Sequence, residues 1–176
     1  MKKLALLILL MMIFQSSVFS RPVVFNDDGK FGLKDENGNI VVKAEYKKLI
    51  RLGETGWIIQ KGSKFGIMND EGKILVEPKY NRADRVLGKF AKLTKGEKIG
   101  LFDEQGFVIL HPEYSSIDLL FGGMFLTCKN YKYGVTDFNG QPILDNVFDD
   151  IYMPKPNVMI ITYNGQKYEI QGIKPG

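Results

Sequence analysis

The chain has 176 residues, 44% of them hydrophobic and 25% charged, with 24 Lys plus Arg, 20 Asp plus Glu and one cysteine. These values predict one globular domain of ordinary size and exclude an internal disulfide framework. Positive and negative charges are interleaved, whereas nucleic-acid binders usually carry a basic patch or stripe, so the composition argues against a nucleic-acid partner.

Residues 1–20 read MKKLALLILLMMIFQSSVFS: two lysines, an apolar run from Leu4 to Phe14, then small and polar residues. This pattern predicts a cleavable secretory signal, with an uncleaved anchor as the alternative. Removing Lys2 and Lys3 lowers the Lys plus Arg count from 24 to 22, against 20 acidic residues. We expect a periplasmic or secreted protein that begins at Arg21 and has no stable membrane insertion.

From residue 30 onward the sequence repeats itself. The copies start at Lys30, Lys64, Lys98 and Lys132, each 34 residues after the last. Each copy has a central glycine, a turn glycine and a closing aromatic residue. The central glycines are Gly32, Gly66, Gly100 and Gly134, and the closing aromatics are Tyr46, Tyr80, Tyr114 and Phe148. A fixed period predicts one supersecondary unit per copy, which buries its apolar face against its neighbours.

The period of 34 also occurs in helical arrays, but the pattern inside each copy favours strands. Phe65 and Ile67 alternate with other residues, as expected in a strand, and residues 69–72 have the Asx and Gly of a type I turn with a bulge. Residues 74–76 form an apolar second strand, expected to be covered on both faces. A leading strand, such as residues 57–61, ends in a two-residue turn.

Each unit is therefore predicted to be a three-stranded antiparallel meander in an all-β protein. Residues 47–56, 81–89, 115–124 and 149–157 have room for a fourth strand or a loop. We expect one domain over residues 21–171, with partial units at both ends and a tail at 172–176. In the last partial unit Glu169 replaces the central glycine if the aromatics are aligned. The partial units favour an open solenoid-like array over a closed propeller-like one.

The landmarks of the repeat are interpreted as structural. Glycine inside a strand indicates a bulge or the close approach of a neighbouring strand or ring. The closing aromatics are expected to be core rings, with a carbohydrate-stacking ladder as the alternative. If the protein binds glycans, the candidate stacking rings are Trp57, Tyr131 and Tyr163.

The positions that vary between copies are better candidates for function. Directly after the closing aromatic stand Lys47-Lys48, Asn81-Arg82, Ser115-Ser116 and Asp149-Asp150, so one position changes from basic to acidic along the array. Such a charge gradient would orient a partner, and ordinary solvated loops are the alternative. The candidate partner-binding residues are Lys47, Lys48, Arg51, Arg82, Asp149 and Asp150.

The sequence contains no recognisable catalytic motif, and we predict no catalytic residue, metal site or cofactor. His111 and Cys128 occupy strand positions that hold other residue types in the other copies, and Cys128 is expected to be partly exposed and idle. Asp84 and Asp118 share one repeat position. An envelope hydrolase would need such carboxylates to be paired across a cleft.

The repeated Lys-aromatic-Gly, the turn glycine, the apolar triplet and the endings Pro78-Lys79-Tyr80 and Pro112-Glu113-Tyr114 resemble the WG (KWG) repeats of bacterial proteins. The aromatic position departs from that pattern, because tryptophan never precedes the glycine. The resemblance implies a β-repeat array used for binding.

We therefore expect a non-enzymatic, exported protein that mediates protein–protein interaction in the bacterial envelope. Two alternatives remain: a periplasmic immunity protein that neutralises an envelope-targeting toxin, and a glycan- or peptidoglycan-binding module.

Overall fold

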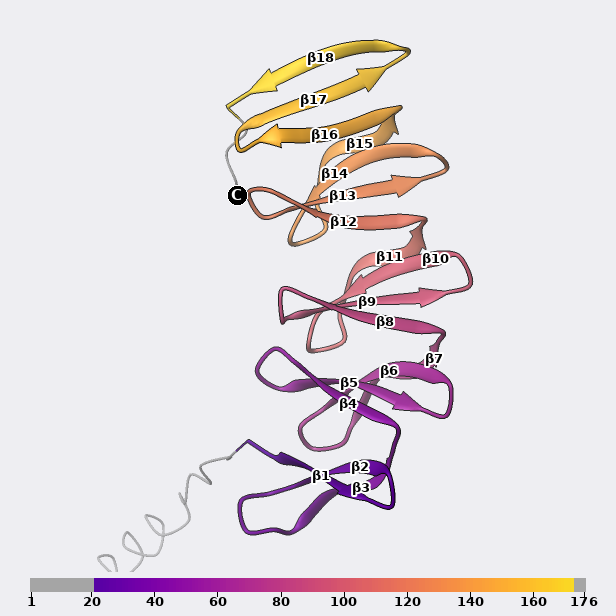
Figure 1. The fold of residues 1–176 in the computed structure, drawn as a ribbon, viewed down its shortest axis with the longest axis vertical. Helices are drawn as coiled ribbons and strands as arrows, with labels where there is room; N and C mark the ends of the chain where they lie inside the picture. Colours follow the sequence, from indigo (N-terminus) through magenta and orange to yellow (C-terminus); the bar gives the residue numbers. More distant parts are fainter. Residues whose placement is uncertain (1–20, 173–176) are drawn as a thin grey trace, which may run out of the picture.

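The computed structural model describes residues 21–172, which form eighteen strands in five small antiparallel sheets (Figure 1). The first sheet contains β1 (Val23–Asp27), β2 (Lys30–Lys34) and β3 (Ile40–Tyr46). The second contains β4 (Lys48–Leu52), β5 (Gly56–Lys61), β6 (Lys64–Asn69) and β7 (Ile74–Tyr80). The third contains β8 (Arg82–Val86), β9 (Phe90–Lys95), β10 (Lys98–Phe102) and β11 (Val108–Tyr114). The fourth contains β12 (Ser116–Leu120), β13 (Met124–Lys129), β14 (Lys132–Asp137) and β15 (Pro142–Phe148). The fifth contains β16 (Asp150–Lys155), β17 (Val158–Tyr163) and β18 (Gln166–Gln171).

The sheets follow one another in an open column, and no propeller-like closure occurs within residues 21–172 (Figure 1). This confirms the predicted all-β, solenoid-like array. The same residues contain no helix that is long and apolar enough to cross a membrane. The predicted signal peptide at 1–20 lies outside the described residues, as does the tail from 173 onward.

The segments that the sequence left open contain a fourth strand: β4, β8, β12 and β16. Each of them pairs with the leading strand that follows it, as β4 pairs with β5, so a new sheet begins directly after each closing aromatic. The link between sheets is fixed by one repeated hydrogen bond. Lys47 N donates to Gln60 O at 2.7 Å, and Asn81, Ser115 and Asp149 donate equivalently one, two and three periods later.

The turns have the predicted geometry. Gly72 N donates to Asn69 O at 3.1 Å, and Gly72 is left-handed with φ 84°. The Asn69 side chain accepts a further hydrogen bond from Lys73 N at 2.8 Å. The two-residue turns are of the primed types, since Gly62 has φ 62° and both Asn164 and Gly165 are left-handed.

The bulge indicated by the central glycines is present. Phe65 pairs with Tyr80 and Ile67 pairs with Val76, so Gly66 alone faces residues 77–79 of β7. A Cβ atom on Gly66 would lie 2.9 Å from Pro78 N. The corresponding atoms on Gly32, Gly100 and Gly134 would also meet the backbone of the bulged strand at 3.0 Å or less.

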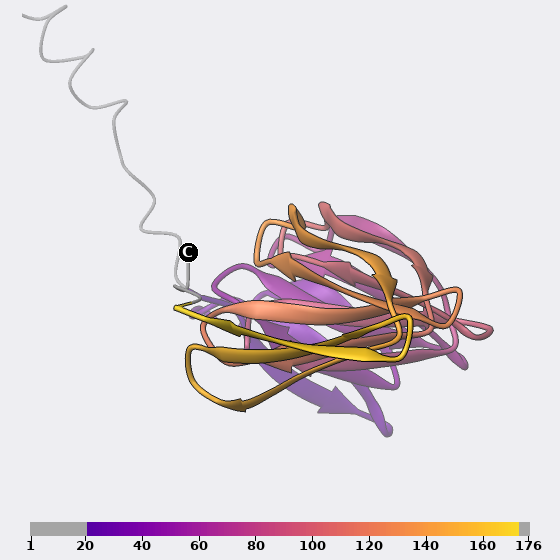
Figure 2. The same cartoon turned by 90° about the horizontal axis from the view of Figure 1, so that it is seen from above.

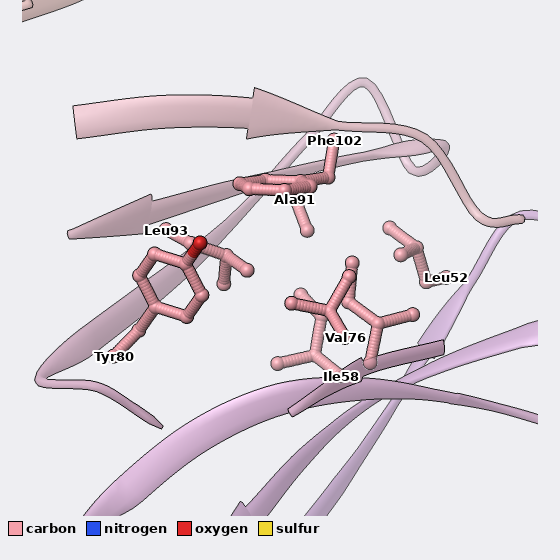
Figure 3. Close-up of a cluster of buried hydrophobic side chains, with 8 residues drawn as sticks. Leu52, Ile58, Val76, Tyr80, Ala91, Leu93 and Phe102 are labelled. Carbon is pink, nitrogen blue, oxygen red and sulfur yellow. The ribbon is translucent and has the colours of Figure 1, made fainter. Parts of the chain in front are cut away.

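The core is divided into four clusters between consecutive sheets. The cluster between the second and third sheets is drawn in Figure 3 and contains Leu52, Ile58, Ile67, Val76, Tyr80, Ala91, Leu93 and Phe102. Side chains of one strand serve two clusters: Ile58 packs toward the third sheet, while Trp57 and Ile59 pack toward the first. Each inner sheet therefore contributes to two cores, as in a solenoid.

Two expectations need correction. Coverage of the apolar triplets on both faces is only partial, because Ile40 is 60% and Val108 43% exposed. In the fifth sheet Tyr168 pairs with Ile161, as Gly134 pairs with Thr127 one period earlier, so Tyr168 and not Glu169 takes the glycine position. A large ring fits there because, among the described residues, β18 is an edge strand with no bulged strand beside it.

The column has two long edges with different contents (Figure 1). The link edge, on the right in Figure 1, carries the two-residue turns and the links between sheets. The loop edge, on the left, carries the type I turns and the loops after β4, β8, β12 and β16.

Candidate functional site

The predicted charge gradient lies on the link edge. Lys47, Lys48, Arg82 and Asp150 are exposed, and Asp149 is half-buried. The acidic end of the gradient is already engaged within the protein. Asp149 pairs with Lys132 Nζ at 2.5 Å, and this hydrogen bond, together with one from Gly165 N at 3.3 Å, lowers the pKa of its carboxyl group.

Arg51, a basic partner-binding candidate like Lys47 and Lys48, is engaged within the protein. It lies on β4, not in a solvated loop, and its guanidinium reaches Asp70 with one nitrogen at 2.5 Å and the other at 3.2 Å. Trp57 Nε1 donates to the same carboxylate at 2.7 Å, and the Arg51 guanidinium lies 4.8 Å from the centre of the Trp57 ring. Asp70 is 4% exposed. This buried cluster satisfies its own charges and hydrogen bonds.

The three predicted stacking rings do not lie together. Trp57 is only 6% exposed and packs in the core, so the prediction that it is an exposed ring is wrong. Tyr163 is 42% exposed and meets Phe148 edge-on, with ring centres 5.8 Å apart. Tyr131 is 94% exposed at the tip of the turn between β13 and β14.

The closing aromatics lie in or against the core. Tyr46 and Tyr80 are both 4% exposed, and Tyr114 and Phe148 pack against the next two clusters. Burial raises the pKa of Tyr46 to about 12, with the charge and hydrogen bond of Glu45 adding to the shift. This arrangement favours core packing over a carbohydrate ladder.

The link edge also carries lysines that the sequence analysis did not single out. Lysines stand on both sides of three two-residue turns and pair directly across the strands: Lys61 with Lys64, Lys95 with Lys98, and Lys129 with Lys132. In the sequence, each pair appears as one lysine on either side of a two-residue turn, and the pairs recur every 34 residues. This pattern was missed because the second lysine of each pair was treated only as the start of a repeat copy.

The loop edge carries an apolar hollow of about 350 Å³ lined by Leu119, Leu120, Phe121 and Met153. Leu119 is 48% and Phe121 56% exposed. Arg51 and Arg85 hold the Leu119 position in the second and third sheets, and Arg85 donates to Arg51 O at 3.0 Å. This repeat position therefore holds an arginine with internal polar contacts in the second and third sheets and an exposed apolar side chain in the fourth.

Two further hollows on the loop edge are related by one repeat period. Thr55, Asn69, Glu71 and Leu75 line the first, and Lys89, Asp103, Gln105 and Ile109 line the second at equivalent positions. Glu104 borders both and accepts hydrogen bonds from Glu54 N and Thr55 N. These hollows are part of the contact between units.

The remaining candidates do not form a reactive site. Cys128 is 8% exposed, so the prediction of a partly exposed thiol is wrong. His111 is exposed, and Asp84 pairs with Arg82 at 2.9 Å. Across residues 21–172, no group of three or more His, Cys, Asp or Glu side chains is arranged to hold a metal ion.

The fold defines a protein of tandem antiparallel β-meander repeats. The family model described as "WG containing repeat" matches residues 31–53, 65–98 and 99–133, and the chain belongs to this family. The match covers the first three copies and stops near the start of the fourth.

No curated protein matches the chain. Two solved structures are among those that match the chain. One, described as a crystal structure of the eukaryotic initiation factor, has 10% identity and a TM-score of 0.44; the match covers 86% of this chain and 50% of that one. The other is PorZ, a surface component of the type-IX secretion system of Porphyromonas gingivalis. It has 12% identity and a TM-score of 0.37, and the match covers 89% of this chain and 26% of that one. This chain thus spans half or less of either protein.

Proposed function

We propose that this chain is a non-enzymatic binding protein of the bacterial envelope and that its partner is a protein held at the loop edge. The apolar hollow supports this proposal most directly. Large apolar side chains that stay exposed around a hollow on a protein surface mark sites of interaction with a protein, a membrane or a ligand. Leu119 and Phe121 form such a site together with Leu120 and Met153.

A protein partner fits the chemistry of the hollow. Its volume of about 350 Å³ can take one or two large apolar side chains, the kind of anchor that contributes most to protein interfaces. Asp118 and Lys155 are exposed on the same two strands, β12 and β16, and provide polar surroundings. An apolar centre with polar surroundings is the usual composition of such an interface.

The test compares two double variants in the purified chain from Arg21. Leu119→Ser/Phe121→Ser removes the anchor site, and Ile40→Ser/Val41→Ser removes exposed apolar side chains from the loop edge of the first sheet. An envelope extract of the host is passed over each immobilised protein, and a retained protein is then purified and titrated. We expect the first variant to weaken its binding about tenfold or more and the second to leave it unchanged.

Equal binding by both variants would contradict the assignment to this hollow. Retention of wall fragments alone, or their turnover by the purified chain, would contradict the protein-binding function itself.

A further inference from the structure

The link edge carries like charges opposite each other at three successive turns. Lys61 faces Lys64, Lys95 faces Lys98, and Lys129 faces Lys132 across antiparallel strands. Like charges at directly opposed positions destabilise a sheet. Neither the turn type nor the core requires lysine there, since Tyr163 and Gln166 occupy the equivalent positions in the fifth sheet. The repeated lysines therefore need an explanation other than folding.

The number of these lysines that form an ion pair with a carboxylate differs from sheet to sheet. In the fourth sheet Lys129 pairs with Glu113 at 2.7 Å and Lys132 with Asp149 at 2.5 Å. One period earlier, Lys79 and Ser115 stand at the positions of these two carboxylates, so Lys95 and Lys98 lack the acidic partners that Lys129 and Lys132 have.

In the second sheet Lys61 pairs with Glu45 at 3.0 Å, whereas Lys64 faces the position of Asn81. Among the described residues, Lys64, Lys79, Lys95 and Lys98 form no ion pair. We call these four residues the lysine patch. It places unpaired positive charge on two adjacent sheets at the same edge.

Tyr131 lies at the next turn tip along the same edge. Its φ of 61° is left-handed, a conformation that costs a non-glycine residue free energy, and the first and fifth sheets have Gly29 and Gly165 at this position. The ring is nonetheless 94% exposed. A strained backbone that holds an aromatic ring in solvent indicates a contact made by that ring.

We propose that the lysine patch and Tyr131 bind an acidic polysaccharide that runs along the link edge. Lysine ammonium groups act as flexible point charges and suit successive acid groups on a polymer. Packed sheets are about 10 Å apart, and two sugar rings of an extended chain cover a comparable length. An acid group on every second ring would therefore meet each sheet in turn, with Tyr131 stacked on a sugar face.

The shape of the edge favours a polymer over a flat bilayer. Seen down the column, the strands of successive sheets point in different directions, so the turns at their ends fan out and do not lie one directly above another (Figure 2). A flexible chain can follow these turns, whereas a plane touches only part of them. This site lies on the edge opposite the apolar hollow and is independent of the proposed protein partner.

The test measures binding of polygalacturonate to the purified chain by calorimetry at low and moderate salt. Lys64→Gln/Lys95→Gln/Lys98→Gln removes three charges of the patch. Lys34→Gln/Lys43→Gln/Lys73→Gln removes the same number from elsewhere and serves as the matched control. We expect the patch variant to bind about tenfold more weakly and with less salt dependence, and the control to change binding about twofold or less.

Tyr131→Gly provides a second readout that loss of folding cannot mimic. It relieves the left-handed backbone, so thermal stability should hold or rise while polygalacturonate binding falls several-fold. Absence of binding at low salt, or equal losses in both triple variants, would overturn the proposal. Equal affinity for polygalacturonate, duplex DNA and anionic lipid vesicles, with no effect of Tyr131→Gly, would reduce the site to unselective polyanion attraction and overturn it too.

Discussion

Gly66 has room for a hydrogen atom but not for a side chain, because three residues of β7 pass opposite it. A valine there would meet backbone atoms, which cannot move aside as a flexible side chain can. We expect Gly66→Val to lower the free energy of unfolding by about 2–4 kcal/mol, measured by urea denaturation. Gln60→Val, on the neighbouring strand β5, should change it by less than about 1 kcal/mol. A Gly66→Val protein as stable as the parent would show that the bulge can open.

Tyr46 shows how burial links stability to pH. Its pKa is raised to about 12, so between roughly pH 10 and 12 the unfolded chain releases a proton that the folded protein keeps. Stability should therefore fall as pH rises through this interval and be insensitive to Tyr46 below it. Urea midpoints measured across the interval should decline less steeply in Tyr46→Phe. Some decline should remain, because burial also raises the pKa of Tyr80 and Tyr114. An identical decline in Tyr46→Phe would contradict this account.

At the scale of the element, β4, β5 and the turn after β6 are joined by Asp70. Removing this carboxylate leaves the Arg51 charge and the Trp57 N–H without their acceptor. We expect Asp70→Ala to lower the free energy of unfolding by about 2–4 kcal/mol. Trp57 is the only tryptophan, so the fluorescence of the protein reports on this cluster. Its emission should shift to longer wavelength because the indole becomes more exposed to water. Glu71→Ala, an exposed change in the same turn, is the control. A stable Asp70→Ala protein with unchanged emission would show that the cluster contributes nothing to folding.

The strands with strong local signals could be predicted from sequence. Asn69 and Gly72 fix the turn after β6 whatever surrounds them, and the alternation around Ile67 fixes the strand. The fourth strand could not be predicted, because β4 is defined by pairing with β5 and its residues have no clear period. Trp57 is buried because it packs in the cluster between the first and second sheets and because Arg51 on β4 lies over its ring. The prediction that Trp57 is an exposed glycan-stacking ring was wrong because this packing could not be seen in the sequence.

The candidate sites were harder to predict than the fold. The charge gradient appears in the linear sequence. The ion pair between Lys132 and Asp149 appears only when the strands are paired, as does the lack of an ion-pair partner for Lys98 among the described residues. The hollow at Leu119 and Met153 joins residues of two different sheets. A linear pattern cannot show which side chains of neighbouring units leave space between them.

The whole molecule is a column in which each inner sheet contacts only the sheets before and after it (Figure 1). Within residues 21–172, no further strand or helix lies along either long edge. A ligand on the link edge and another on the loop edge would not compete for space. The repeat thus separates residues that hold the units together from residues that vary between the copies.

Because the four core clusters are separate, damage to one of them should stay local. Ile161 is 3% exposed between the fourth and fifth sheets, and Ile58 is fully buried between the second and third. Each Ile→Ala change should destabilise the sheets around its cavity by about 2–4 kcal/mol. In an array with only nearest-neighbour contacts, the effect should fade with distance from the cavity. Native-state hydrogen exchange should therefore accelerate in the fourth and fifth sheets of Ile161→Ala, and in the second and third sheets of Ile58→Ala. The first sheet should keep its protection in Ile161→Ala. Equal acceleration of all five sheets by both variants would instead show that the column unfolds as a single cooperative unit.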